Sequence, residues 1–187
     1  MARPDAPVVI FDFDGTLVDS DEALLVPFDR LGVARDDVLM GSAVAEECER
    51  HGISLRDYVE AYDTEVVEPF PGIEDMLARL GRWAMLSNKH PDSALAELGR
   101  LGWEPEVVMC ADAFEWAHKS LVPMLDAMGL TAAEVVMVGD SGGDVSCAQE
   151  VGCRFIWAGW NHRVRAARPG GEVATTPATL LDLLGLA

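Results

Sequence analysis

The pattern of apolar and polar residues changes along the chain. Residues 8–11 form an unbroken apolar run with β-branched side chains. Such a run indicates a strand covered on both faces, as in a parallel sheet. From Ile73 onward, helical patterns alternate with short apolar runs, which predicts a parallel sheet with crossover helices. We therefore expect an α/β fold with a doubly wound sheet.

The later elements follow from the same pattern. A last helix is expected from Pro177, with Thr176 as its N-cap. Segment 159–176 mixes Arg, Gly and Pro, and predicts a partly ordered loop. The remaining strands are expected at 82–86, 106–111, 134–138 and 153–158, and helical patterns that end at a glycine lie between them.

A different pattern fills residues 20–67, where three helical segments occur without a convincing strand. The first runs from Ser20 to a stop at Gly32, and the second from about 37 to 51. In the third, apolar residues recur at helical spacing from Leu55 to Tyr62. We predict a small all-α cap over residues 19–70, inserted after the first strand, and a catalytic core made of 1–18 and 71–187.

Composition narrows the possible partners. The net charge of −18 disfavours nucleic acids and anionic membranes, because both repel such a surface. The four cysteines form no C-x-x-C pair and are expected as free thiols in a reducing compartment. The N-terminus lacks a signal-peptide pattern, and no apolar run is long enough to span a bilayer. We expect a cytoplasmic protein.

Candidate chemistry lies where the predicted strands end. The first strand finishes in two carboxylates, Asp12 and Asp14. Like charges this close are costly unless a cation or a reaction uses them, and Mg²⁺ is the simplest such cation. A second acidic pair, Asp140 and Asp144, flanks a glycine-rich turn that opens a helix. Either carboxylate could instead act only as a helix N-cap.

The segment Asp12-Phe13-Asp14-Gly15-Thr16-Leu17 resembles the first motif of the haloacid dehalogenase-like hydrolases. Residues 139–144 are similar to the last motif of that family, and Ser87 to its second. Lys119 resembles the lysine of the third motif, although Ser120 stands where the family often has proline. The resemblance covers nearly the whole chain, and the four motifs occur in the family's order.

This resemblance implies a strand order of 3-2-1-4-5, with the four motifs together at the carboxyl ends of the strands. Asp12 would be the nucleophile and Asp14 the general acid and base. Ser87 and Lys119 would bind the phosphate. The implied Mg²⁺ ligands are Asp12, Asp140, the backbone carbonyl of Asp14 and, directly or through water, Asp144.

A subgroup is also indicated. Ser87-Asn88-Lys89 resembles the Thr-Asn-Lys of phosphoglycolate-phosphatase-like enzymes, so Asn88 would orient phosphate or Asp12, with turn formation as the alternative. The family's dehalogenases lack an acidic residue at the position of Asp14, so phosphate chemistry is favoured. The predicted cap resembles the helical cap of this subgroup but is shorter, which predicts incomplete closure and broad substrate choice.

The predicted function is thus Mg²⁺-dependent hydrolysis of small phosphate monoesters, with a small phosphorylated metabolite as substrate. One alternative is a phosphotransferase of the β-phosphoglucomutase type. Another is a non-catalytic binding module on the same scaffold. Two sets of arginines are expected to be mainly solvated, although the second could draw in an anionic substrate. They are Arg30, Arg35, Arg50 and Arg56 in the cap, and Arg163, Arg165 and Arg168 after the fifth strand.

Overall fold

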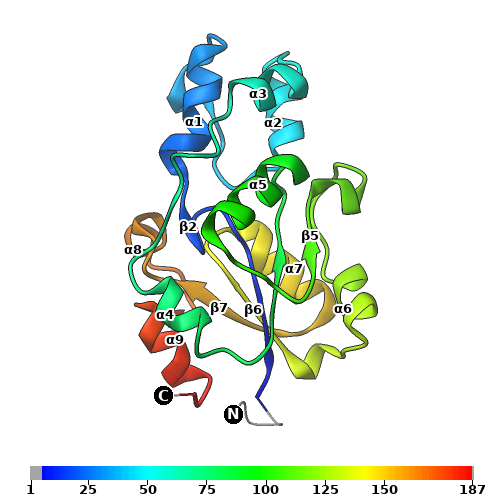
Figure 1. Cartoon of the computed structure of the whole chain (residues 1–187), viewed down its shortest axis with the longest axis vertical. Helices are drawn as coiled ribbons and strands as arrows, with labels where there is room; N and C mark the ends of the chain where they lie inside the picture. The colour runs from blue at the N-terminus through cyan, green and yellow to red at the C-terminus, as the bar shows by residue number, and fades with distance from the viewer. Residues whose placement is uncertain (1–5, 187) are drawn as a thin grey trace.

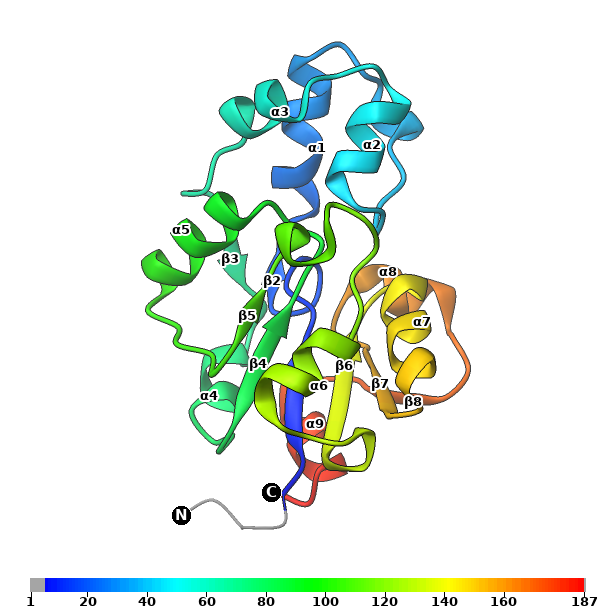
Figure 2. The same ribbon diagram turned by 90° about the vertical axis from the view of Figure 1, so that its right-hand side faces the viewer.

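A six-stranded parallel sheet forms the centre of the protein. The computed structural model describes residues 6–186, and Figures 1 and 2 show the sheet below a separate group of helices. The sheet order is β5-β4-β1-β6-β7-β8. Its strands are β1 (Val8–Phe11), β4 (Trp83–Leu86), β5 (Val108–Met109), β6 (Val135–Gly139), β7 (Arg154–Ala158) and β8 (Glu172–Ala174).

The predicted strand order is confirmed, because the first five predicted strands lie as 3-2-1-4-5 and every neighbouring pair is parallel. The prediction of a loop over 159–176 is wrong. This segment contains helix α8 (His162–Ala167) and strand β8. Strand β8 has only three residues, so its apolar pattern is too short to be recognised from sequence.

Each face of the sheet has its own apolar core. Val9 and Phe11 of β1 point to one face, and Val8 and Ile10 to the other, because side chains alternate along a strand. The first face is covered by α4 (Ile73–Leu77), α5 (Pro91–Leu101) and α9 (Pro177–Leu183). Helices α6 (Val122–Met128) and α7 (Gly142–Val151) cover the second face. Burial of β1 on both sides explains its continuous apolar run.

The separate group of helices consists of α1 (Asp21–Arg30), α2 (Val44–Arg50) and α3 (Leu55–Ala61), and lies above the carboxyl ends of the strands (Figure 1). We call this group the cap and the rest of the molecule the core. A two-stranded antiparallel ribbon of β2 (Val18–Asp19) and β3 (Glu68–Pro69) joins the cap to the core. The second cap helix begins later than predicted. Gly41 has a φ of +90°, which a right-handed helix excludes, so α2 starts only after it. Short 3₁₀ turns occur at Arg35–Asp37 (η1), Ala111–Phe114 (η2) and Ala132–Glu134 (η3).

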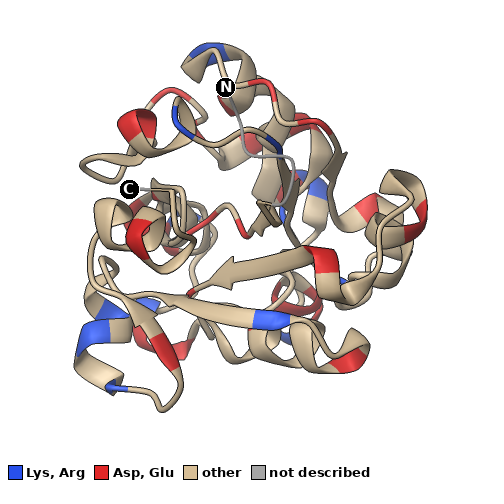
Figure 3. Cartoon of the chain, turned by 90° about the horizontal axis from the view of Figure 1, so that it is seen from below, with Lys and Arg blue, Asp and Glu red and all other residues tan. Residues whose placement is uncertain are grey.

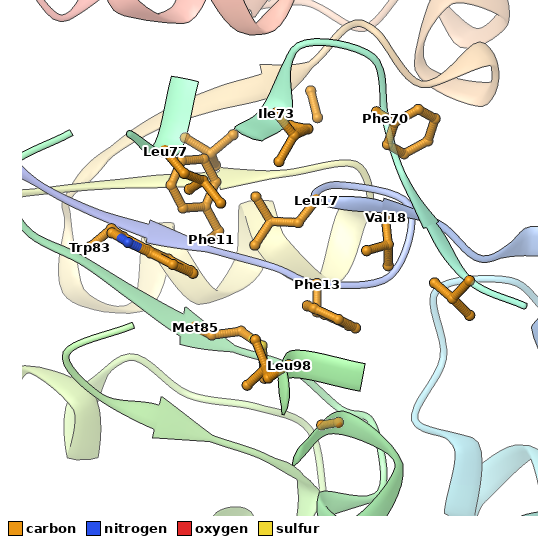
Figure 4. Close-up of a cluster of buried hydrophobic side chains, with 14 of the residues drawn as sticks. Phe11, Phe13, Leu17, Val18, Phe70, Ile73, Leu77, Trp83, Met85 and Leu98 are labelled. Atoms are coloured by element: carbon orange, nitrogen blue, oxygen red, sulfur yellow. The ribbon is translucent and has the colours of Figure 1, made fainter. Parts of the chain in front are cut away.

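The apolar core on the first face of the sheet continues into the cap. Figure 4 shows Phe13, Leu17, Val18 and Phe70 packed along this path. The same cluster includes Tyr58 of α3. Because the cluster is continuous, the position of the cap over the core is stabilised by apolar burial as well as by the ribbon.

The surface is strongly acidic, with 32 acidic and 14 basic residues in the sequence. Figure 3 shows Asp and Glu spread over many helices and loops rather than gathered on one face. Within residues 6–186, every helix is too short or too polar to cross a bilayer.

Gly159 tests the placement of the unexpected strand β8. Its N–H donates to the carbonyl of Ala174, 2.8 Å away, and a Cβ added there would lie 2.5 Å from Val173 Cγ1. Gly159→Ala should therefore lower the free energy of unfolding by about 1–3 kcal/mol through overpacking. Gly170→Ala, whose Cβ would meet no atom within 4 Å, is the matched control. Equal denaturation midpoints for the two variants would contradict the pairing of β7 with β8.

Candidate active site

Asp12 lies at the point where β1 leaves the sheet. Its N–H donates to the carbonyl of Val138 at 2.9 Å, so the pairing with β6 continues one residue beyond the strand. The chain then turns sharply, and three successive N–H groups from Thr16 to Val18 donate to the carbonyl of Phe13. Gly15 takes a φ of +77° in this turn, a conformation that favours glycine. The turn places Asp12 and Asp14 at the mouth of the sheet.

Lys119 holds the buried carboxylates together. Its Nζ lies 2.5 Å from Asp12 Oδ1 and 2.6 Å from Asp144 Oδ1. Lys119 comes before α6 rather than within its first turn, and its backbone N–H donates to Asn88 Oδ1 at 2.8 Å. Asn88 therefore positions the lysine, which the sequence prediction for Asn88 did not include.

Asp144 is fully buried at the start of α7. Its Oδ2 accepts hydrogen bonds from the N–H and Oγ of Ser141, the helix N-cap, and from the N–H of Asp140. Oδ1 has no well-aligned hydrogen bond and contacts the Lys119 ammonium. The alternative that Asp140 or Asp144 is the N-cap is wrong, because Ser141 is the N-cap. Asp144 completes the capping box from the third helical position and also faces the acidic cluster.

Three carboxylates converge at this point. One oxygen from each of Asp12, Asp140 and Asp144 lies within 4.8 Å of the others. Burial raises the pKa of Asp12 well above its usual range, against the opposing effect of Lys119. Burial and then Asp144 raise the pKa of Asp140 to about 6. The cluster therefore resists ionisation in the absence of a further cation.

Ser87 follows β4 and borders the same cavity as the acidic cluster. Its N–H donates to the carbonyl of Met109, which fixes it in the sheet register, and its Oγ accepts from the N–H of Lys89. The cavity has a volume of about 70 Å³. Asp12, Asp14, Ser87, Asn88, Lys119 and Asp140 all line it.

Asn161 and Arg163 both contact Asp140, and the sequence did not predict either contact. Asn161 is buried at the N-cap of α8, and its Nδ2 donates to the carbonyl of Gly15 at 2.7 Å and to Asp140 Oδ2 at 3.1 Å. Arg163 Nη2 lies 2.5 Å from Asp140 Oδ2 and 3.1 Å from Asp21 Oδ1. The expectation of a solvated arginine is wrong for Arg163. Asn161 is a polar residue that follows the predicted strand 153–158 closely, and as a possible helix N-cap it is the signal that could have identified α8.

Lys89 is the second cation that sequence reasoning did not place in the site. Its Nζ lies 2.9 Å from Asp14 Oδ1, and its side chain is buried. The sequence comparison with Thr-Asn-Lys assigned a role only to Asn88. The structure instead gives each carboxylate of the first motif its own lysine, Lys119 for Asp12 and Lys89 for Asp14.

The short cap reaches the core at several points around the cavity. Gly41 lies against Ser141, and Glu46 Oε1 is 3.5 Å from His118 Nε2. A short cap was expected to close incompletely, but in this structure it contacts the core beside the cavity. The cap residues that line the cavity are all uncharged: Leu24, Met40, Gly41, Ser42, Val44, Tyr58 and Tyr62. The four cap arginines are exposed, as predicted.

Known proteins are similar to this chain in sequence and in fold. The chain is 28% identical to a phosphoglycolate phosphatase of Xanthomonas campestris pv. campestris, over 83% of this chain and 84% of that protein. It is 30% identical to phosphoglycolate phosphatase 1 of Pseudomonas aeruginosa, over 90% and 74% of the two chains.

A haloacid dehalogenase-like hydrolase from Streptococcus pneumoniae superposes with a TM-score of 0.72 at 20% identity, over 97% of this chain and 99% of that one, and shows the shared fold. The family model described as haloacid dehalogenase-like hydrolase matches residues 29–158, which is more than half of the chain. The chain therefore belongs to the haloacid dehalogenase-like hydrolase family.

Proposed function

We propose that the protein is a Mg²⁺-dependent phosphatase that hydrolyses small phosphate monoesters through an aspartyl-phosphate on Asp12. The observation that carries this proposal is the arrangement of Asp12, Asp14, Ser87 and Lys119 around one small cavity. A nucleophilic carboxylate, a second carboxylate for proton transfer and two phosphate-binding donors are the groups that this chemistry needs. The phosphatase relatives support the same reaction class.

The acidic cluster fits a magnesium ion. Carboxylate oxygens are the hard ligands that Mg²⁺ prefers, and the buried Asp144 Oδ1 lacks a well-aligned hydrogen bond. Asp12, Asp140 and Asp144, together with the backbone carbonyl of Asp14, would hold the ion. When bound, Mg²⁺ would offset the repulsion between a dianionic phosphate and the carboxylates.

The residues of this chain then divide the reaction between them. Lys119, Ser87 and Asn88 bind the phosphate against Asp12. The Asp12 carboxylate attacks phosphorus, and Asp14 donates a proton to the leaving oxygen. Asp14 next takes a proton from water, which attacks the phosphoenzyme and regenerates Asp12. The cap excludes bulk water from the cavity during these steps.

The cavity also limits the substrate. Cap side chains border it together with the core, which favours a small leaving group when the cap lies in this position. The net charge of −18 disfavours nucleic acids and anionic membranes as partners. All four cysteines are free thiols, which supports the cytoplasmic location that we propose.

Asp140→Asn tests the metal site through stability. Because burial and Asp144 raise the pKa of Asp140 to about 6, ionisation of this group opposes folding in the metal-free protein. This loss of folding free energy is absent below about pH 4, where Asp140 is protonated in both states, and complete above about pH 6–7. In EDTA, the variant should therefore gain as much as about 3 kcal/mol over the wild type as pH rises through this window.

Chemical denaturation between pH 4 and 8 measures this difference. Asp126→Asn, at an exposed position on α6, is the control and should show no such trend. Added Mg²⁺ should raise the thermal midpoint of the wild type above pH 6 and raise that of Asp140→Asn much less. A wild-type thermal midpoint that does not change when Mg²⁺ is added would contradict the metal assignment.

Asp12→Asn tests the nucleophile. A carboxamide is a poor nucleophile, so steady-state turnover should fall by at least about 10³-fold. The shape of the side chain is kept, so circular dichroism should show the same folded state as the wild type. Retention of turnover within tenfold of the wild type, in protein free of contaminating phosphatase, would remove Asp12 from this role.

Asp14→Asn tests the general acid and base. An aryl phosphate with an activated leaving group needs no proton, so phosphorylation of Asp12 should survive in this variant. Hydrolysis of the phosphoenzyme should slow by ~10²–10⁴-fold because its general base is lost. Stopped-flow absorbance should show a burst of phenolate near one equivalent, followed by slow turnover.

An alkyl phosphate is the comparison for the same variant, because its leaving oxygen requires the proton. With this substrate, rapid-quench measurements should detect no fast phosphorylation. An equal loss on both substrates, without a burst, would mean that Asp14 acts through structure or metal binding. A phosphoenzyme that is slow to hydrolyse in the wild type itself would favour phosphotransfer over hydrolysis.

A further inference from the structure

We propose that Lys89, anchored by Glu97 of the core and Tyr62 of the cap, is the positioning residue for the Asp14 carboxylate. This inference rests on the proposed role of Asp14 in proton transfer. It adds to that role a cap-dependent anchor, which lies on the opposite side of the first motif from Lys119.

Three polar neighbours surround the Lys89 ammonium, which donates hydrogen bonds to Asp14 and Tyr62 and forms an ion pair with Glu97. Its Nζ lies 2.9 Å from Asp14 Oδ1, 2.7 Å from the Tyr62 hydroxyl and 3.1 Å from Glu97 Oε2. The Tyr62 hydroxyl in turn donates to Glu97 Oε1 at 2.7 Å. The ammonium also stands 4.4 Å from the centroid of the Tyr62 ring and 5.6 Å from that of Phe13. These contacts restrict Lys89 to one position.

Stability alone does not explain why a glutamate occupies position 97. It is fully buried on α5, beside the apolar Ala94 and Leu98. Buried ion pairs often contribute less to stability than apolar side chains of similar size would. A leucine at position 97 would continue the apolar face of the helix. The charge is therefore better explained by what it does to Lys89, which is to orient the ammonium toward Asp14.

The contact leaves Asp14 able to react. Lys89 engages Oδ1, and among the described residues Asp14 Oδ2 accepts no hydrogen bond, so this oxygen can face a leaving group or water. Proton transfer is efficient only when donor and acceptor lie within hydrogen-bond reach. Fixing one carboxylate oxygen sets the direction of the other.

The anchor spans two parts of the molecule. Tyr62 is the C-cap residue of α3 in the cap, whereas Lys89 and Glu97 belong to the core. The three-residue anchor is complete only when the cap lies over the core, as it does in this structure (Figure 1). Asp14 is thus held most firmly when the cap covers a bound substrate and excludes water.

The experiment compares Lys89→Met with Asp14→Asn in the full-length protein. Lys89→Met should lower kcat on an alkyl phosphate and slow phosphoenzyme hydrolysis by about 10²-fold, with KM changed less, because a misplaced group costs that much. The burst rate on an aryl phosphate, which needs no proton, should stay within about threefold of the wild type. Adding Lys89→Met to Asp14→Asn should cost little more than Asp14→Asn alone, because the two residues act as a unit.

Two further variants isolate the anchor. Tyr62→Phe, which removes the hydroxyl, should show the same selective loss in a weaker form. Tyr58→Phe is the comparison for the hydroxyl, because the Tyr58 hydroxyl donates to the Leu24 carbonyl within the cap. Tyr58 also lines the cavity, so only the ratio of its aryl and alkyl rates is compared, and not the absolute rates. Tyr58→Phe should leave the ratio of aryl to alkyl rates unchanged.

A second variant tests whether Lys89→Met acts by destabilising the fold. Lys89→Met leaves Glu97 buried without its cation, so Lys89→Met/Glu97→Gln, which removes both charges, is measured in parallel with thermal midpoints. If either variant that folds loses aryl burst and alkyl turnover equally, or if its effect is additive with that of Asp14→Asn, the positioning role is wrong. Absence of the leaving-group signature in Asp14→Asn itself would instead overturn the proposed role of Asp14 in proton transfer, on which this inference rests.

Discussion

Mutual repulsion among buried carboxylates is the constraint on which the rest of this structure depends. Asp12 ends β1, and Asp140 and Asp144 follow β6, the neighbouring strand. Parallel pairing of these two strands brings the three groups to one edge of the sheet. Lys119 contacts Asp12 and Asp144, and Arg163 contacts Asp140, so each carboxylate has a cationic neighbour. Loops from three parts of the chain are needed to supply this balance.

Much of this arrangement could be predicted because it depends on local signals. Buried strands appear as continuous apolar runs, and the polar residues that end them appear in sequence as interruptions. Asp12, Ser87 and Asp140 were found in this way, and the predicted strand order places them at the same edge. Their individual roles follow from the resemblance and remain part of the proposal.

The parts that could not be predicted depend on long-range contacts. Glu97 sits where the helical pattern calls for an apolar residue, and its partners Tyr62 and Lys89 are 35 and 8 positions away in the chain. The local sequence does not show which groups would surround a glutamate at that position. Arg163 is similar, because its contact with Asp140 depends on α8 being ordered, and α8 lies in a segment whose composition is typical of loops.

The two carboxylates of the first motif show how neighbouring groups separate chemical roles. Asp12 and Asp14 are identical side chains two residues apart, but the turn after Phe13 directs them to different lysines. Asp12 faces the acidic cluster beside Lys119, whose residues would hold the proposed metal ion. Asp14 faces Lys89 on the cap side, where a leaving group would depart. The ion-pair partner of the proposed nucleophile comes from the core, whereas the lysine beside the proposed proton-transfer group also contacts Tyr62 of the cap. The proposed reaction is therefore coupled to cap position through Asp14 more directly than through Asp12.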